Sequence, residues 1–116
     1  MVRRRGFERG DIVFVDLDPT AGSEQRGRRP VLVLTNVDYN TAIGRALVAP
    51  ITQGGNFARF GDFAINLNGT GLDTQGVVML TDLRVVDLSA RHPKHIEVAP
   101  HYLVELVLDR VKALLD

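Results

Sequence analysis

The sequence contains no cysteine and no tryptophan, and its 14 basic and 14 acidic residues leave no formal net charge. Without cysteine the chain cannot form disulfides, use a thiolate nucleophile or build a cysteine-based zinc site, and such a composition is typical of a reducing compartment. Without net charge the chain has no global field that would attract nucleic acid or a membrane surface. Any basic binding site must therefore be local.

Long apolar runs are also absent. No run approaches the roughly 18 residues that a membrane span needs. The three arginines at residues 3–5 resemble the start of a signal peptide, but Glu8, Arg9 and Asp11 lie where the apolar part of such a peptide would be. We therefore expect a soluble, cytoplasmic protein with no membrane partner, folded as a single domain over residues 1–116.

Short stretches rich in β-branched residues predict a mainly β fold. The expected strands are 11–17, 31–35, 46–51, 62–67, 76–88 and 95–99. The segment 76–88 is too long for one flat strand and is expected to bend or bulge near Thr81 and Asp82. Residues 37–43 are expected to form a short helical turn.

Only the C-terminal segment shows the periodicity of a longer helix. Pro100 suits its first turn, and apolar residues recur at three- and four-residue steps at Leu103, Val107, Val111 and Leu114. Short strands closed by one terminal helix indicate a small, partly open SH3-like β-barrel. The apolar stripe either covers the helix's own barrel or also forms a homodimer interface, and both interpretations are open.

The polar segment "DPTAGSEQRGRR" places three arginines, Arg26, Arg28 and Arg29, directly before an apolar strand. Pro30 follows Arg29 and disfavours a helical backbone at Arg29, so this arginine is expected to be extended and to begin the strand. Its planar guanidinium suits phosphate oxygens. An ion pair with Glu24 or Asp18 is the alternative, and such a pair would also orient the guanidinium.

Thr52 ends another apolar strand and precedes the glycine-rich stretch "QGGN". Its hydroxyl either hydrogen-bonds a bound anion or only satisfies a turn. The glycines lack the GK[ST] of a P-loop, which argues against an NTPase.

The three histidines, His92, His95 and His101, lack the spacing of zinc ligands. They are expected to lie at the surface or to serve packing. We expect no metal and no cofactor.

Two segments, "ERGDIVFVDLDPTAGSEQRGRRPVLVLT" and "APITQGGNFARFGDFAINL", resemble the MazF/PemK family of toxin endoribonucleases, and "GGNFAR" favours its PemK/Kid and ChpB branch. The likeness runs from about Gly10 to the C-terminal helix. It implies a CcdB/PemK-like barrel that forms a homodimer and cuts single-stranded RNA without metal at a short recognition sequence. It also implies a cognate antitoxin protein that inhibits the toxin by occupying the RNA groove.

The resemblance implies attack of a 2′-hydroxyl on its own 3′-phosphate, which leaves a 2′,3′-cyclic phosphate and a 5′-hydroxyl. This reaction in messenger RNA would inhibit translation and growth. It needs a base, an acid and donors for the phosphorane charge. By the resemblance Arg29 donates to the phosphorane, Thr52 holds a non-bridging oxygen, and Glu24 orients Arg29 or acts as the base. Further RNA contacts are expected from Gln25, Arg26, Arg28, Gln53, Asn56, Phe57, Arg59 and Arg84. Phe57 and Phe60 either stack bases or plug the barrel.

The chain departs from the PemK branch at three positions. Met79 and Thr81 stand where that branch has arginine and aspartate, and Ser23 stands where it has histidine. Asp82 is one place later on the strand, so its side chain would point to the other face unless a bulge intervenes. The general acid and base therefore stay open among Glu24, Thr81 and Asp82.

Two other classes of protein are considered. A gyrase-binding toxin of the CcdB kind depends on a tryptophan near the chain end, which this sequence lacks. A nucleic-acid-binding SH3-like module would not cleave RNA at all. In such a module, replacement of Arg29 by alanine would only weaken binding.

Overall fold

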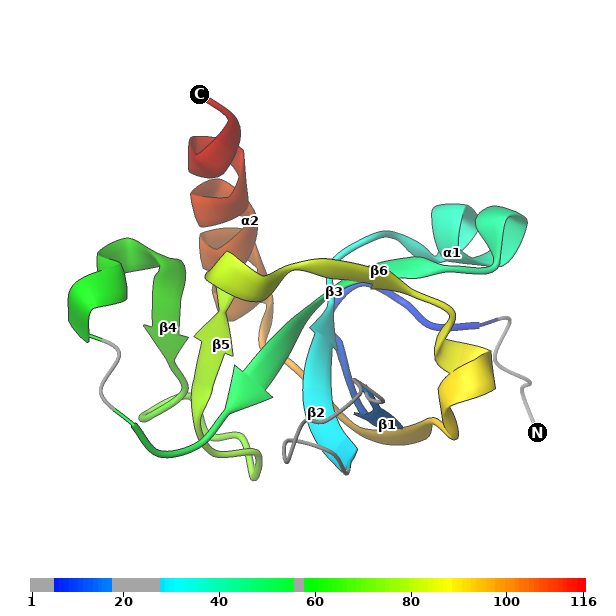
Figure 1. The fold of residues 1–116 in the computed structure, drawn as a ribbon, viewed down its shortest axis with the longest axis horizontal. Helices are drawn as coiled ribbons and strands as arrows, with labels where there is room; N and C mark the ends of the chain where they lie inside the picture. The colour runs from blue at the N-terminus through cyan, green and yellow to red at the C-terminus, as the bar shows by residue number, and fades with distance from the viewer. Residues whose placement is uncertain (1–5, 18–27, 56–57) are drawn as a thin grey trace, which may run out of the picture.

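Seven strands form an antiparallel sheet in the computed structural model, which describes residues 6–17, 28–55 and 58–116, the side chains of 58 and 59 excepted. The strands are β1 (Asp11–Asp16), β2 (Arg28–Val33), β3 (Ala46–Thr52), β4 (Ala64–Asn66), β5 (Val77–Met79), β6 (Arg84–Val86) and β7 (Lys94–Val98). Their order is β4-β5-β3-β2-β1-β7, with β6 paired to β3 (Figure 1). The expected mainly β, partly open fold with a C-terminal helix is confirmed.

Within the described residues, two α-helices and three 3₁₀ turns connect or flank the strands. They are α1 (Val37–Ile43), α2 (His101–Leu115), η1 (Ala58–Phe63), η2 (Leu80–Asp82) and η3 (Leu88–Arg91). The expected short helix at 37–43 is confirmed. Asn36 caps it, because the Asn36 side chain accepts a hydrogen bond from the amide of Tyr39 at 2.8 Å, and Gly44 ends it in the left-handed conformation.

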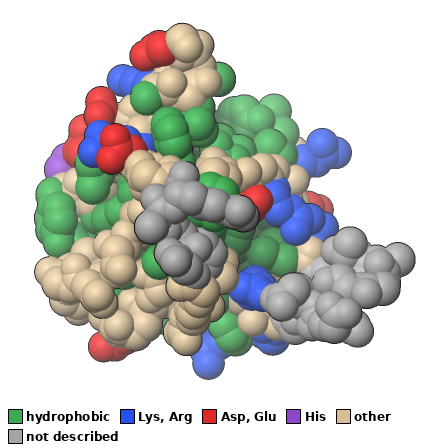
Figure 2. Space-filling model, turned by 60° about the vertical axis from the view of Figure 1, so that its left-hand side comes forward, with side chains coloured by type: hydrophobic (Ala, Val, Ile, Leu, Met, Phe, Trp, Pro, Cys, Tyr) green, Lys and Arg blue, Asp and Glu red, His purple; other side chains and the backbone are tan. Residues whose placement is uncertain are grey.

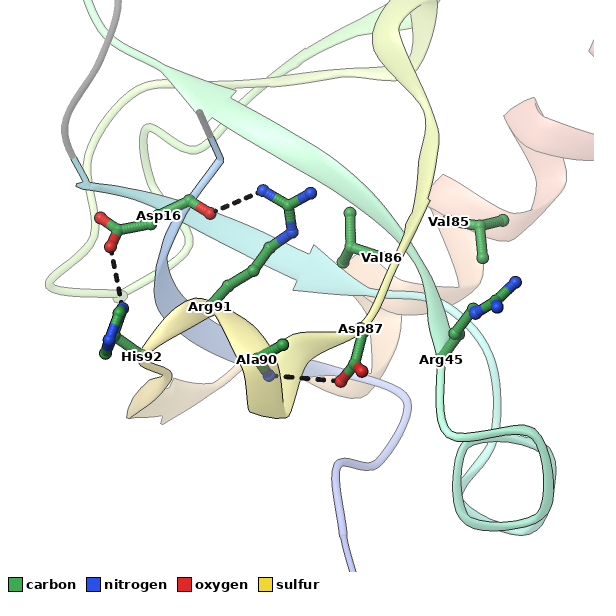
Figure 3. A pocket seen from close by; sticks show the side chains of 8 residues that line it. All are labelled: Asp16, Arg45, Val85, Val86, Asp87, Ala90, Arg91 and His92. Carbon is green, nitrogen blue, oxygen red and sulfur yellow. Dashed lines mark hydrogen bonds and ion pairs between the residues drawn. The ribbon is translucent and has the colours of Figure 1, made fainter. Parts of the chain in front are cut away.

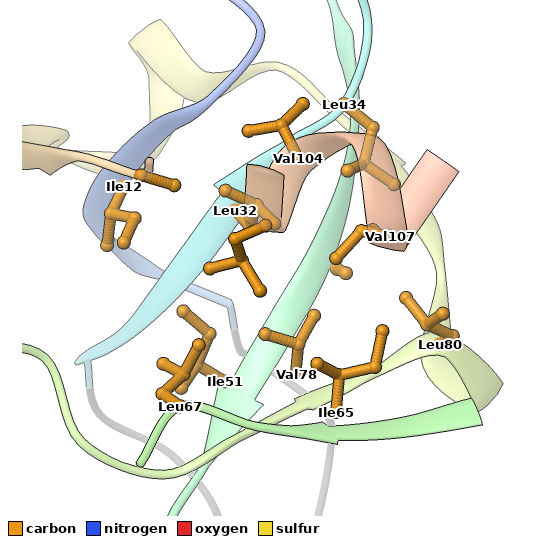
Figure 4. Packing of buried hydrophobic residues seen from close by; sticks show 13 residues of the cluster. Ile12, Leu32, Leu34, Ile51, Ile65, Leu67, Val78, Leu80, Val104 and Val107 are labelled. Atoms are coloured by element: carbon orange, nitrogen blue, oxygen red, sulfur yellow. The ribbon is translucent and has the colours of Figure 1, made fainter. Parts of the chain in front are cut away.

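Apolar side chains cover both faces of the sheet, which explains why β2 and β3 read as continuous apolar runs. One face carries the helix-side cluster, which includes Leu32, Ile51 and Val78 together with Leu103 and Val107 of α2 (Figure 4). The other face carries the opposite-face cluster, formed by Val13, Val15, Leu17, Val31, Val33, Ala46, Val48, Val86 and Leu88.

Helix α2 uses its N-terminal half to cover the sheet. Leu103, Val104 and Val107 are buried, whereas Leu114 and Leu115 are exposed near the end of the helix, which projects beyond the strands (Figure 1). The stripe thus caps the helix's own sheet in part, and the rest of it stays exposed. Pro100 is the N-cap with an extended backbone rather than a first-turn residue, a correction of one position.

The segment 76–88 bends as expected, because η2 separates β5 from β6. The expected strand at 62–67 is shorter, and only residues 64–66 are strand. Gly61 lies within η1 at a φ of 57°, a conformation that side-chain-bearing residues rarely adopt and that interrupts an extended chain.

Strand β3 changes partner along its length. Its first three residues pair with β6 and its last two, Ile51 and Thr52, pair with β5. The carbonyl of Leu47 accepts from the amide of Leu34 in the segment after β2, so odd-numbered residues of β3 direct their backbone groups toward β2 and even-numbered ones toward the other edge. Pro50 lies between the residues of β3 that pair with β6 and those that pair with β5, and it has no N–H to give to either strand.

Candidate active site

Arg29 lies in β2, as its proline neighbour led us to expect. It pairs with Val15 of β1 and is half-buried. The strand begins at Arg28, three residues before the predicted start, because pairing with β1 extends to Asp16. Arg29 is thus rooted in a paired strand, and its side chain has less freedom to lose than a loop arginine would on binding an anion.

Pro30 marks the end of the ladder between β2 and β3. The paired residues nearest this end are Val31 and Pro50. Even-numbered residues of β2 direct their backbone groups toward β3, because the amide of Leu34, in the same phase, donates to the carbonyl of Leu47. Pro30 has no N–H to give to β3, so the next rung lacks one of its two hydrogen bonds. Beyond this point β3 diverges from β2 (Figure 1).

Continuing the β2–β3 register past its last pair sets Arg29 across from Thr52, the final residue of β3. By strand alternation both side chains belong to the face that carries the opposite-face cluster, since Arg29 is in phase with Val31 and Thr52 with Val48. Arg84, which pairs with Val48, shares this face. The fold thus brings Arg29, Thr52 and Arg84 to one face of the sheet, with Arg29 and Thr52 where β2 and β3 part and Arg84 beside Val48.

Arg28 is engaged in contacts within the protein. Its Nη2 donates to the carbonyls of Phe14 at 3.2 Å and His92 at 2.5 Å, and its Nη1 lies 3.8 Å from a carboxylate oxygen of Asp16. The guanidinium also lies 5.3 Å from the centre of the Phe14 ring. These contacts give Arg28 a structural role, while its expected RNA contact stays a prediction.

Two further arginines hold the end of β1. Arg84 Nη1 donates to the carbonyl of Leu17 at 3.2 Å, and Arg91 Nη1 donates to the carbonyls of Asp16 and Leu17, both at 3.0 Å. Arg91 was not among the residues expected from the sequence. Its contacts join residues more than 70 positions apart, and no local sequence pattern predicts such contacts.

A hollow of about 600 Å³ opens beside these residues (Figure 3). It is lined by Asp16, Arg45, Val85, Val86, Asp87, Ala90, Arg91 and His92. The Nδ1 of His92 lies 3.1 Å from the Asp16 carboxylate, and His92 has a φ of 52°, rare for a residue with a side chain. Because acidic and basic groups both line the hollow, its wall has no single sign of charge.

Thr81 and Asp82 both lie in η2 and are exposed. A 3₁₀ turn intervenes between the strands, so strand alternation does not govern the direction of either side chain. Met79, which stands where the PemK branch has arginine, is buried at the end of β5, opposite Ala64. Its apolar side chain completes the packing of the sheet there.

Several predicted site residues lie outside the described residues. They are Glu24, Gln25, Arg26, Asn56 and Phe57. The side chain of Arg59 is likewise not described. Gln53 follows Thr52, and its Nε2 donates to the carbonyl of Gln75 at 3.5 Å. Phe60 is half-buried in η1.

The other two histidines also pair with carboxylates, at separate places. His95 lies 3.1 Å from Asp11, a buried carboxylate that also accepts from the amide of Glu8, and His101 lies 3.6 Å from Glu105 on α2. In the part of the chain that the structure describes, no three histidine, aspartate or glutamate residues gather as metal ligands would.

On the face in Figure 2 basic and acidic side chains both occur, with hydrophobic side chains exposed between them. Within the described residues no helix has the length and apolar character to cross a membrane.

Comparison with known proteins places this chain in a family. Residues 8–115 match the protein-family model described as the PemK-like, MazF-like toxin of type II toxin–antitoxin systems. The chain is 45% identical to Endoribonuclease PemK of Escherichia coli over 99% of this chain and 87% of that protein. It is 47% identical to Endoribonuclease toxin ChpB of Escherichia coli K12 over 100% of both chains.

The fold is similar to that of a solved relative. The crystal structure of MazE-MazF from Deinococcus radiodurans superposes with a TM-score of 0.79 at 29% identity, covering 93% of this chain and 94% of the matched one. The family model, the two relatives and the shared fold agree with the resemblance noted in the sequence. The chain belongs to the PemK-like, MazF-like toxins of type II toxin–antitoxin systems.

Proposed function

We propose that this protein is a sequence-specific endoribonuclease toxin that cleaves single-stranded messenger RNA without a metal ion and so inhibits translation and growth. The observation that carries the proposal is the placement of Arg29 and Thr52 at the facing ends of β2 and β3, where the strands part. The chain's relatives PemK and ChpB, both endoribonucleases, support the substrate class.

The proposed reaction transfers the phosphoryl group within the RNA. The 2′-hydroxyl oxygen bonds to the adjacent 3′-phosphorus, the bond from phosphorus to the 5′-oxygen breaks, and a 2′,3′-cyclic phosphate and a 5′-hydroxyl result. One proton leaves the 2′-hydroxyl and one reaches the leaving 5′-oxygen. The Arg29 guanidinium stabilises the phosphorane oxygens by its charge and its N–H donors.

The remaining roles follow from the resemblance to the MazF/PemK family. Thr52 donates its hydroxyl hydrogen to a non-bridging phosphate oxygen. Glu24 accepts the proton of the 2′-hydroxyl or orients Arg29, and Thr81 and Asp82 are the other candidates for proton transfer. Gln25, Arg26, Arg28, Gln53, Asn56, Phe57, Arg59 and Arg84 contact the flanking nucleotides.

We further propose how the protein is assembled and controlled. The whole chain forms one toxin domain that works as a homodimer in the cytoplasm, where messenger RNA is translated. The Deinococcus radiodurans structure pairs MazF with MazE, which supports an antitoxin protein as the partner of this chain. Such a partner inhibits by occupying the RNA groove.

The proposed function is tested by incubating the purified protein with a long unstructured RNA in excess EDTA and mapping the cut ends. We expect cuts at one short sequence, with 2′,3′-cyclic phosphate and 5′-hydroxyl ends, at a rate that EDTA does not change. Absence of cleavage, or cleavage that EDTA abolishes, contradicts the proposal.

Binding of RNA is expected to weaken steeply as salt rises, because the arginines displace counterions from phosphates. With an RNA made uncleavable by 2′-deoxy substitution, each phosphate contact contributes about 0.7 to the slope of log Kd against log salt concentration. Replacing Arg29 by alanine is expected to lower that slope by about 0.7.

The matched control for this measurement is Arg110→Ala. Arg110 lies on α2, over the other face of the sheet, and pairs with Asp109 at 3.1 Å. Its replacement is expected to leave the slope unchanged. Equal slopes for the wild type and Arg29→Ala would remove Arg29 from the phosphate contacts.

A further inference from the structure

Glu97 joins the two ends of the strand order. It lies on β7, the last strand in the order, while the residues it binds, Asp73 and Thr74, lie in the connection between β4 and β5 at the first end. Oε1 of Glu97 accepts from the amide of Asp73 at 3.1 Å. Oε2 accepts from the amide of Thr74 at 2.7 Å and from the Thr74 hydroxyl at 2.5 Å. One carboxylate thus bridges strands that no backbone ladder connects.

The carboxylate of Glu97 is held in its ionised form. Burial alone raises its pKa, but the hydrogen bonds from the side chain and amide of Thr74 and the amide of Asp73 outweigh burial, so the pKa of Glu97 lies below its ordinary value. A lowered pKa in the folded protein means that these bonds are present at neutral pH and are lost as the pH falls through that value.

The segment that Glu97 holds continues directly to Thr52. Gln53 donates to the carbonyl of Gln75, and Val77 pairs with Thr52. Gly76 lies between them at a φ of 124°, and a Cβ placed on it would stand 2.7 Å from the carbonyl oxygen of Thr52. Gly76 and Val77 therefore lie against the backbone of Thr52, without room for a side chain at Gly76.

We propose that Glu97 is a positioning residue of the RNA-cleaving site, which acts by fixing residues 73–76 and through them the backbone of Thr52. The inference rests on the proposed function of this site. Glu97 itself contacts no reacting atom. Its carboxylate acts through the segment that ends at Gly76, and a displacement of about 1 Å at Thr52 is enough to lower the rate strongly.

The test uses Glu97→Gln and Thr74→Val, with Thr74→Ser and Glu105→Gln as controls. Glutamine cannot accept from all three donors, valine removes the hydroxyl, and serine retains it. Glu105 is an exposed carboxylate on α2. Amide hydrogen exchange of the protein without RNA is expected to quicken about tenfold or more at Asp73 and Thr74 in Glu97→Gln.

Cleavage kinetics supply the readout that a merely structural residue would not change. In Glu97→Gln and Thr74→Val we expect kcat to fall about tenfold or more while KM changes less, with Thr74→Ser close to the wild type. The wild type is expected to lose kcat as the pH falls through the pKa of Glu97, a loss that is absent from the profile of Glu97→Gln.

The outcomes separate the two proposals. A wild type that does not cleave RNA contradicts the proposed function and this inference with it. A wild type that cleaves, with kcat unchanged in Glu97→Gln and Thr74→Val, contradicts the inference alone. If Glu97→Gln fails to fold, the comparison of kcat between Thr74→Val and Thr74→Ser decides. Both variants keep the carboxylate of Glu97 and differ in the hydroxyl that it accepts from.

Discussion

Arg29→Ala is expected to lower the rate of RNA cleavage by about 100-fold or more, because it removes the donors that meet the charge developing on the phosphorane. The measurement is single-turnover cleavage of a short RNA that contains the recognition sequence, which separates the chemical step from binding. Arg29→Lys keeps the charge without the planar fork and is expected to recover only part of the rate.

Two controls accompany this measurement. Arg110→Ala, on α2, is expected to cleave at the wild-type rate, and circular dichroism establishes that each variant is folded. A folded Arg29→Ala that cleaves as fast as the wild type would exclude Arg29 from the mechanism. Thr52→Ala provides the parallel test for the hydroxyl, with a loss of similar order expected.

Leu103→Ala is expected to destabilise the protein by about 2–5 kcal/mol, the range for removing a buried leucine side chain. Leu103 is 2% exposed and packs from α2 into the helix-side cluster. Since domains are stable by only about 5–15 kcal/mol, this change removes a large share of the free energy of unfolding. Urea denaturation monitored by far-UV circular dichroism measures it.

Leu115→Ala is the matched control, since Leu115 lies on the same helix and is 84% exposed. Its replacement is expected to change the free energy of unfolding by no more than about 0.5 kcal/mol. Equal destabilisation by the two changes would contradict the assignment of α2 as the cover of its own sheet.

Much of the fold could be predicted from the sequence because its strands are apolar and its turns are marked by glycine and proline. The predicted starts of β1 and β3 are correct, and β7 is displaced by one residue. The β2 strand begins earlier than its apolar run, because pairing with β1, a tertiary contact, orders Arg28 and Arg29. The segment before β4 coils instead of extending, since Gly61 turns the chain there.

The candidate site was predictable only in part. Arg29 and Thr52 could be named from the sequence, because Pro30 favours an extended backbone at Arg29 and Thr52 stands at the end of an apolar run. Their common face required the register between β2 and β3, which strand patterns do not specify. Arg91 and Glu97 could not be found this way, because the partners of Glu97 are 23 and 24 residues distant and lie on no shared helix or hairpin.

Pro30 also limits how far β2 and β3 can pair beside Arg29. The ring of Pro30 replaces the amide hydrogen that would otherwise bond to β3. The ladder between β2 and β3 therefore cannot gain a further rung with both hydrogen bonds on the side of Arg29 and Thr52. The separation of the two strands is thus favoured by the covalent structure of the backbone rather than by a side-chain contact. Because it comes from the chain itself, we expect this limit on pairing to be the same with and without bound RNA.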